Sequence, residues 1–418
     1  MLLINVHSGQ RLLNIFLRGV TLLSRFLFVF VLAKFLEPVE VGLYGLLGAT
    51  ISYVIMALGF DFYTYSTREM IVADRSRWAA MLRDQGIFYG ISYVIFLPAC
   101  GFIFWYGFLP WTVAMWFFPL LVLEHAAQEF NRVLVALSEP LWASVVLFVR
   151  SGSWALGVSI WLLFFPAQRS LDFVFAAWAA SVFIACVFGA FLLRRLAPGS
   201  LVCRVDWGWI KRGICVAFPF VLGTMSLRAF YTFDRYWIES LGGLDVLAAY
   251  ALFVGVSNAI AAVIDASVFS FSYPSIVAAA GKKDKSEFLK KLKNMYIQTF
   301  VVMIMLSITA LIITRLFINE IDRSVYKDNF IFLYWLVLAN AFFSMSMVPH
   351  YGLYALRKDR LIILSHIYAV PIFFISIIVM HSILGVLAVP VGMSITFLFL
   401  FSVKTMLFHR CNPVAMDV

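Results

Sequence analysis

Apolar segments long enough to cross a membrane follow one another along nearly the whole chain, separated by short polar loops. A helix of about 20 apolar residues spans the hydrocarbon core of a bilayer. The pattern therefore predicts an all-α polytopic membrane protein with about 12 transmembrane helices. The predicted spans are residues 10–36, 41–64, 86–108, 112–136, 141–165, 171–193, 212–239, 246–279, 295–318, 329–356, 361–380 and 383–408.

The predicted spans divide into two sets of six that meet in the basic loop of residues 194–212. Each set would begin on the same side of the membrane, which is the arrangement of parallel repeats. We therefore predict two six-helix lobes around a central cavity. The N-terminal lobe would comprise residues 1–197 and the C-terminal lobe residues 198–418.

The first predicted span carries polar residues on one helix face. Its polar positions are three or four residues apart, so they form a stripe along the helix. An arginine near the bilayer centre costs roughly 2.5–3.5 kcal/mol on insertion scales, so the stripe should face a protein interior or a water-filled cavity. The stripe consists of Arg11, Asn14, Arg18, Thr21 and Arg25.

The seventh predicted span repeats this spacing at Arg228, Tyr231 and Arg235. In a protein of two similar lobes, Arg18 and Arg228 would face each other across the cavity. We interpret both stripes as a cationic, substrate-binding surface.

Carboxylates inside predicted spans are the candidates for binding a coupling ion. Glu124 and Glu129 lie on one face of the fourth span, close to Arg132. A local Glu129–Arg132 pair would only neutralise charge, whereas an exposed carboxylate could bind H⁺ or Na⁺. Arg150 in the fifth span either pairs with one of these carboxylates or extends the cationic surface.

Two further carboxylates lie in the C-terminal half. Asp234 neighbours Arg228 and Arg235, which favours a local pair over a coupling role, whereas Asp265 lies deep in the eighth span. We keep both as candidate coupling residues. Three histidines are each alone in an apolar span, and we interpret them as packing residues: His350, His366 and His381.

Charge and composition narrow the class of protein to which the chain can belong. Only 13% of the residues are charged, against about 25% in soluble domains. If the N-terminus is inside, the inner loops hold eighteen basic residues and the outer loops three, so the positive-inside rule predicts cytoplasmic termini. The net charge of +10 is explained by this asymmetry, and no nucleic-acid-binding module is present.

No motif of an enzyme or a cofactor site occurs. The sequence has no GxSxG, P-loop, HExxH or Gly-rich dinucleotide loop. The five cysteines have no spacing of metal ligands or of a disulfide framework, and the N-terminus lacks the pattern of a cleaved signal peptide. We expect no cofactor and no metal, and a chain that transports, conducts or acts as an enzyme within the membrane.

Several stretches resemble a known family. LEPVEVGLYG at residues 36–45 and GFDFYTYSTRE at 59–69 resemble the N-terminal pattern of the Wzx-type polysaccharide flippases. These belong to the multidrug/oligosaccharidyl-lipid/polysaccharide exporter superfamily. FDRYWIES at 233–240, followed by AAYA at 248–251, resembles the family's seventh-span pattern of an Asp, a short turn and a Tyr.

The resemblance implies a transporter of the bacterial inner membrane. It would move undecaprenyl-diphosphate-linked oligosaccharide to the periplasmic face by alternating access, for O-antigen-like surface polysaccharide, with other polysaccharide-assembly membrane proteins as partners. The arginines suit a diphosphate, because a guanidinium binds phosphate oxygens with two parallel hydrogen bonds. The substrate-binding candidates are Arg18, Arg25, Arg150, Arg228, Arg235 and Tyr231; the coupling-ion candidates are Glu124, Glu129, Asp234 and Asp265.

Two alternatives remain open. A drug or cation antiporter of the same fold would need an acidic cavity for cationic substrates, and the balance here is cationic. An integral-membrane glycan polymerase or ligase usually carries a large periplasmic loop, whereas the longest outer loop here is residues 319–329.

Overall fold

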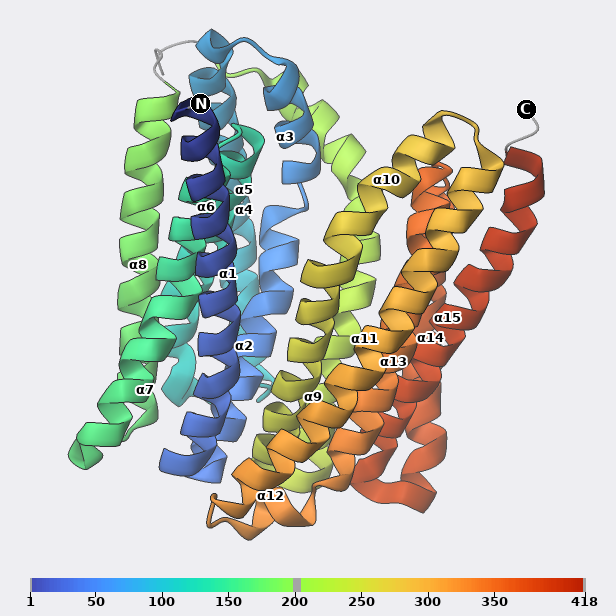
Figure 1. Cartoon of the computed structure of the whole chain (residues 1–418). Helices are drawn as coiled ribbons and strands as arrows, with labels where there is room; N and C mark the ends of the chain where they lie inside the picture. The colour runs from blue at the N-terminus through green and yellow to red at the C-terminus, as the bar shows by residue number, and fades with distance from the viewer. Residues whose placement is uncertain (1, 198–203, 416–418) are drawn as a thin grey trace. The chain divides into compact units, whose positions relative to one another are not determined.

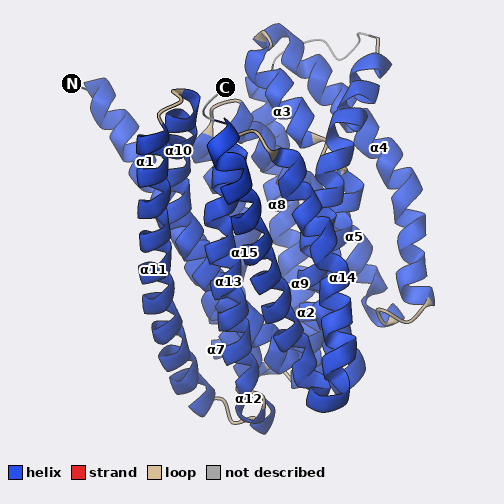
Figure 2. Ribbon diagram, turned by 90° about the vertical axis from the view of Figure 1, so that its right-hand side faces the viewer, coloured by secondary structure: helices blue, strands red, loops and turns tan. Residues whose placement is uncertain are grey.

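The computed structural model describes the backbone of residues 2–197 and 204–415, and the side chains of residues 12–197 and 204–411. Every regular element within these ranges is a helix, and no strand is present there (Figures 1 and 2). Cys203 and part of the predicted linker of residues 194–212 lie outside the described ranges.

Contacts divide the chain into two compact units. The first comprises Met1–Leu36 and Leu46–Val221, and the second comprises Glu37–Gly45 and Leu222–Val418. Most of the predicted N-terminal lobe lies in the first unit. The short segment Glu37–Gly45 belongs to the second unit because it packs against residues there.

That segment is held by an ion pair and by close backbone packing. Arg323 donates hydrogen bonds of 2.6 and 2.8 Å to the two carboxylate oxygens of Glu37, and this lowers the pKa of the exposed Glu37 carboxyl. A Cβ on Gly42 would lie 2.2 Å from the Leu244 carbonyl oxygen, and one on Gly45 would lie 2.8 Å from the Ala251 Cβ. The resembling stretches 36–45 and 248–251 thus pack together through small residues.

The first unit contains most of the early helices (Figure 1). Phe60, Asp61 and Ser138 have positive φ angles although none of them is a glycine. The first two follow the end of α2, and Ser138 follows the end of α5. A six-residue π-helical segment, η2, interrupts the fifth span. The elements are α1 (Leu2–Phe35), α2 (Pro38–Gly59), α3 (Tyr63–Val72), α4 (Arg75–Trp105), η1 (Trp111–Val113), α5 (Ala114–Ala136), α6 (Pro140–Leu147), η2 (Phe148–Ser153), α7 (Trp154–Phe164), η3 (Pro166–Gln168) and α8 (Leu171–Leu196).

The second unit begins within α9 (Trp207–Ile264), which a non-helical residue, Gly243, divides into two spans. Gly243 has φ 77° and ψ 178°, a conformation open essentially only to glycine. A second π-helical segment follows α9. The remaining elements are η4 (Asp265–Phe269), α10 (Ser270–Gly281), α11 (Lys285–Asn319), α12 (Ser324–Asp328), α13 (Ile331–Ala355), α14 (Asp359–Leu384), η5 (Gly385–Leu387) and α15 (Ala388–Ala415).

The described residues contain nine helical stretches long and apolar enough to cross a membrane. Two of these are double: Trp207–Gly281 contains both spans around Gly243, and Asp359–Cys411 contains α14 and α15. α5 is absent from the nine because its polar residues lower its hydropathy. With α5, the described part of the chain has the predicted 12 helical spans, so the predicted fold class is confirmed.

Candidate functional site

The polar centre of the first unit is α5, the helix that breaks the apolar pattern. Glu124 and Glu129 are only 7% and 5% exposed, and His125 between them is fully buried. A buried carboxylate is tolerated only when it is paired or hydrogen-bonded. The surrounding helices supply these partners.

Glu124 is held by residues of two other spans. The Arg150 Nε donates a 2.5 Å hydrogen bond to Oε2, and a second guanidinium nitrogen pairs with the same oxygen. The Trp178 indole of α8 donates a 2.6 Å bond to Oε1. Arg150 lies in η2, and π-helical segments of this kind are frequent at functional sites. Of the roles left open for Arg150, the structure therefore shows a pair with Glu124.

Glu129 is held by three groups in a compact network. Oε2 accepts bonds from the Tyr89 hydroxyl at 2.6 Å and the Gln85 amide at 3.2 Å, and Oε1 accepts from Arg132 at 2.5 Å. The Arg132 guanidinium also lies 3.6 Å from the ring centroid of Tyr63. The local Glu129–Arg132 pair is present, but α3 and α4 contribute as much to the network as α5 does.

His125, which lies between the two carboxylates in the sequence, contacts tyrosines of α4. Its Nδ1 lies 2.7 Å from the Tyr93 hydroxyl, and its ring packs edge-on against Tyr89. Its Nε2 is buried and has no hydrogen-bond partner within the described side chains. A Cβ on Gly59 would lie 2.8 Å from this nitrogen, so the glycine leaves room for the imidazole. Its position next to Glu124 was the only sequence signal for His125.

The predicted stripe on α1 separates into a buried threonine and exposed arginines. Thr21 is buried and bonds back to a main-chain carbonyl of its own helix, whereas Arg18 and Arg25 are exposed. The Arg18 Nε donates a 3.1 Å bond to the Ser144 hydroxyl of α6, which in turn donates to the Asn14 side chain. The Arg25 guanidinium makes no hydrogen bond or ion pair with the residues that the structure describes. The Arg11 side chain is outside those residues.

In the second unit, Asp234 is completely buried at 0% exposure. Its Oδ2 accepts a 2.8 Å bond from the Tyr250 hydroxyl, and its Oδ1 accepts a 2.7 Å bond from the Arg235 main-chain N–H. The Arg235 guanidinium lies 3.4 Å from Oδ1 and also donates to the Tyr231 carbonyl. The local pair expected for Asp234 is therefore formed, and the Asp and Tyr of the resembling pattern meet directly.

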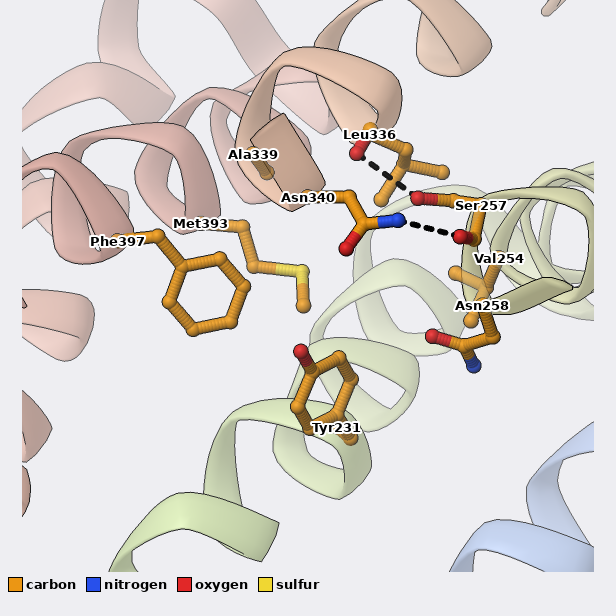
Figure 3. Close-up of a pocket in the computed structure, with 9 residues that line it drawn as sticks. All are labelled: Tyr231, Val254, Ser257, Asn258, Leu336, Ala339, Asn340, Met393 and Phe397. Atoms are coloured by element: carbon orange, nitrogen blue, oxygen red, sulfur yellow. Dashed lines mark hydrogen bonds between the residues drawn. The ribbon is translucent and has the colours of Figure 1, made fainter. Parts of the chain in front are cut away.

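A small cavity lies beside this pair (Figure 3). Its volume is about 10 Å³, close to the smallest that holds one water molecule. The Asn340 amide donates a 2.5 Å bond to the Ser257 carbonyl at its edge. Met393 in its wall also lies 3.4 Å from the Tyr250 hydroxyl that binds Asp234. The lining residues are Tyr231, Val254, Ser257, Asn258, Leu336, Ala339, Asn340, Met393 and Phe397.

The remaining candidates are exposed. Arg228 is exposed on α9, and Asp265 is exposed at the first position of η4. The Asp265 carboxylate forms no hydrogen bond or ion pair with any residue in the described ranges. The tertiary structure thus pairs Glu124, Glu129 and Asp234 inside their own units and leaves Asp265 unpaired. Within residues 12–197 and 204–411, no group of His, Cys, Asp and Glu side chains is arranged to hold a metal ion.

Comparisons with known proteins support the fold. No family model matches the chain, and no curated protein matches it by sequence. Its structure is similar to the inward-facing conformation of a multidrug resistance MATE family transporter of the MOP superfamily, with a TM-score of 0.76 and 14% identity over 97% of this chain and 99% of that chain. The outward-facing conformation of such a transporter is also similar, with a TM-score of 0.65 and 14% identity over 98% of this chain and 95% of that chain.

A third similar structure is a MOP superfamily transporter from Pyrococcus furiosus, for which reverse polarity of the binding pocket suggests a different function. It has a TM-score of 0.62 and 13% identity, over 98% of this chain and 95% of that chain. These similarities show that the chain has the fold of MOP superfamily transporters.

Proposed function

We propose that this protein is a transporter that moves undecaprenyl-diphosphate-linked oligosaccharide across the bacterial inner membrane by alternating access. The observation that carries this proposal is the distribution of charge. Three of the four candidate carboxylates are buried and held by partners, whereas Arg18, Arg25 and Arg228 are exposed. The exposed charge on the predicted stripes is therefore positive and suits an anionic substrate.

The chemistry of a diphosphate fits these side chains. A guanidinium can bind two phosphate oxygens at once through charge-assisted hydrogen bonds. Such contacts would offset the cost of bringing the anionic headgroup between the helices, while the polyprenyl tail stays in the bilayer. Each unit carries its own arginine stripe, so each could hold the headgroup in turn as the transporter changes conformation.

The alternative is a drug or cation antiporter of the same fold, which the similarity to multidrug transporters supports. Cationic substrates would require an accessible carboxylate, and Asp265 is the one candidate carboxylate that the structure leaves exposed. The similar structure described as having a binding pocket of reversed polarity supports the idea that one fold serves substrates of different charge. The fold makes a glycan polymerase or ligase the weaker alternative.

The test compares the single variants Arg18→Ala and Arg228→Ala with the single variant Arg360→Ala. Arg360 is an exposed arginine at the start of α14, so its variant is the matched control. Each charge-assisted hydrogen bond is worth roughly 1.5–3 kcal/mol, so each stripe variant should bind the glycolipid roughly ten- to hundredfold more weakly. Surface glycan in cells and flipping of labelled glycolipid in vesicles should fall at normal membrane abundance.

Lysine at either stripe position should restore export only in part, because it keeps the charge but not the forked geometry. Normal export by both alanine variants would overturn the cationic mechanism. Drug efflux that depends on Asp265 but not on Arg18 would favour the antiporter.

A further inference from the structure

A second cluster of titratable side chains, with Lys404 and His366 buried and His350 half-buried, lies among α13, α14 and α15, which run side by side in the second unit (Figure 1). Lys404 of α15 is 0% exposed, and His366 of α14 is 7% exposed. The Lys404 Nζ lies 3.5 Å from the Nδ1 of His350 in α13. The rings of His350 and His366 are stacked, with centroids 6.1 Å apart and an interplanar angle of 19°.

The cluster consists of bases without an acid. Among the side chains that the structure describes, neither Lys404 nor either imidazole forms an ion pair with a carboxylate. The His366 Nε2 is buried and has no hydrogen-bond partner there. This contrasts with Glu124, Glu129 and Asp234, each of which is held by a guanidinium.

The neighbouring elements supply mainly phenols. Tyr351 of α13 packs edge-on against His350 and stacks on Tyr273 of α10, and Tyr296 lies on α11. Asp265 of η4 acts electrostatically on Tyr351. α14 begins at Asp359, two turns before His366. No guanidinium or carboxylate therefore fixes the charge of the cluster by direct contact.

This arrangement limits how many protons the cluster can hold. A buried ammonium without a counter-charge is costly, and each added positive charge among adjacent bases repels the others. The states of low cost are therefore the neutral cluster and a cluster with one proton. An ammonium on Lys404 can donate to the His350 Nδ1, and a neutral amine can accept from a protonated ring.

The cluster is also close to one end of its helices. His350 is five residues from the end of α13 and His366 seven residues from the start of α14, which corresponds to about 8 and about 11 Å along the helix axes. The short connection between these helices, residues 356–358, places both histidines near the same end. A proton would need to cross only part of the membrane to reach them.

We propose that Lys404, His350 and His366 form a proton-binding site that takes up and releases one proton in each transport cycle. Uptake forms one N–H bond and breaks one O–H bond of a hydronium ion, which leaves as water, and release returns the proton to water by the reverse step. The coupling role rests on the proposed transport function, whereas proton binding by the cluster does not. The site would make the export proton-coupled through bases of the second unit.

The direct test is NMR of the purified full-length protein in lipid nanodiscs with ¹⁵N-labelled histidine. Substitution of single histidines assigns the rings. Coupled bases titrate as a unit, so the His350 and His366 signals should change together with pH. In Lys404→Met the titration midpoints of His350 and His366 should separate or move by about one pH unit, because coupled groups change each other's titration by about that much.

His381→Gln, which replaces an exposed histidine of the same α14, is the matched control and should leave the cluster signals unchanged. Lys404→Met keeps the length of the side chain and removes a buried charge, so the variant should fold. If neither ring titrates between pH 5 and 9, or if Lys404→Met leaves both midpoints in place, the proton site is overturned.

Vesicle transport tests the coupling role. A pH gradient should accelerate flipping of labelled glycolipid by the wild type. One pH unit corresponds to a tenfold effect, so Lys404→Met should lose at least about nine-tenths of this acceleration. Wild-type flipping that ignores the gradient would overturn the coupling role. A complete lack of glycolipid flipping would overturn the proposed function, while the NMR result would still decide whether the cluster binds a proton.

Discussion

The buried carboxylates of Glu124 and Glu129 are stabilised by partners from other spans. Glu124 takes its partners from η2 and α8, and Glu129 takes its partners from α4 as well as from its own helix. Such pairs are held in place by packing, so the loss of one partner leaves the other as an uncompensated buried charge. The pair of Arg150 and Glu124 is the most direct case.

Arg150→Met should destabilise the protein by about 3–5 kcal/mol, because it leaves the Glu124 carboxylate without its counter-charge. The double variant Arg150→Met with Glu124→Gln should recover most of that loss. The free energy of unfolding can be measured by SDS titration in mixed micelles. Arg194→Met, at an exposed arginine of α8, serves as the control and should change little. A double variant as unstable as Arg150→Met alone would show that the arginine acts mainly through packing.

At the scale of elements, irregular positions in the helices determine the arrangement of spans and polar residues as much as the regular turns do. Gly243 separates the two spans of α9, and π-helical segments carry Arg150 and Asp265. Small residues set the closest approach between helices, as at Gly42 and Gly45 of α2. The Glu37–Gly45 segment is therefore sensitive to the addition of a single methyl group.

Gly42→Ala should lower the free energy of unfolding by about 1–3 kcal/mol, the usual cost of overpacking, because its Cβ would lie 2.2 Å from a main-chain oxygen. Gly48→Ala is the matched control in the same helix. No atom lies within 4 Å of a Cβ there, so this change should be neutral or stabilise the helix by up to about 1 kcal/mol. Equal melting temperatures for the two variants would contradict the close contact.

At the scale of the whole molecule, the 12 helical spans of the described residues and the fold of MOP superfamily transporters indicate a multi-pass membrane protein. Its orientation is predicted from the loops. The short basic connection before α11, residues 282–284, and the loop before α14 should lie on the cytoplasmic side, and the loop at α12 on the periplasmic side.

Reporter fusions can measure this orientation. Fusions at Lys285 and Lys358 should report cytoplasm, and a fusion at Arg323 should report periplasm, because basic residues are retained inside. A fusion at Lys327, in the same loop as Arg323, provides an internal control and should agree with it. A periplasmic signal at Lys285 would contradict the predicted orientation of the second unit.

The sequence alone was sufficient to predict the all-helical membrane fold and the number of spans. Hydrophobicity over about 20 residues is a local property, and lipid forces the main chain to satisfy its own hydrogen bonds within each helix. Periodicity also located the polar stripe on α1 and the polar face of α5. These are properties of one helix at a time, so they need no knowledge of its neighbours.

Only the tertiary structure decided which charges meet. Arg150 had several possible roles in the sequence, and packing of η2 against α5 selected Glu124. Lys404 was not singled out, and His350 and His366 were interpreted as lone packing residues, yet α13, α14 and α15 bring all three together. Helical periodicity gives the direction of a side chain but not the identity of the helix it faces, and the free energy of a buried charge depends on that neighbour.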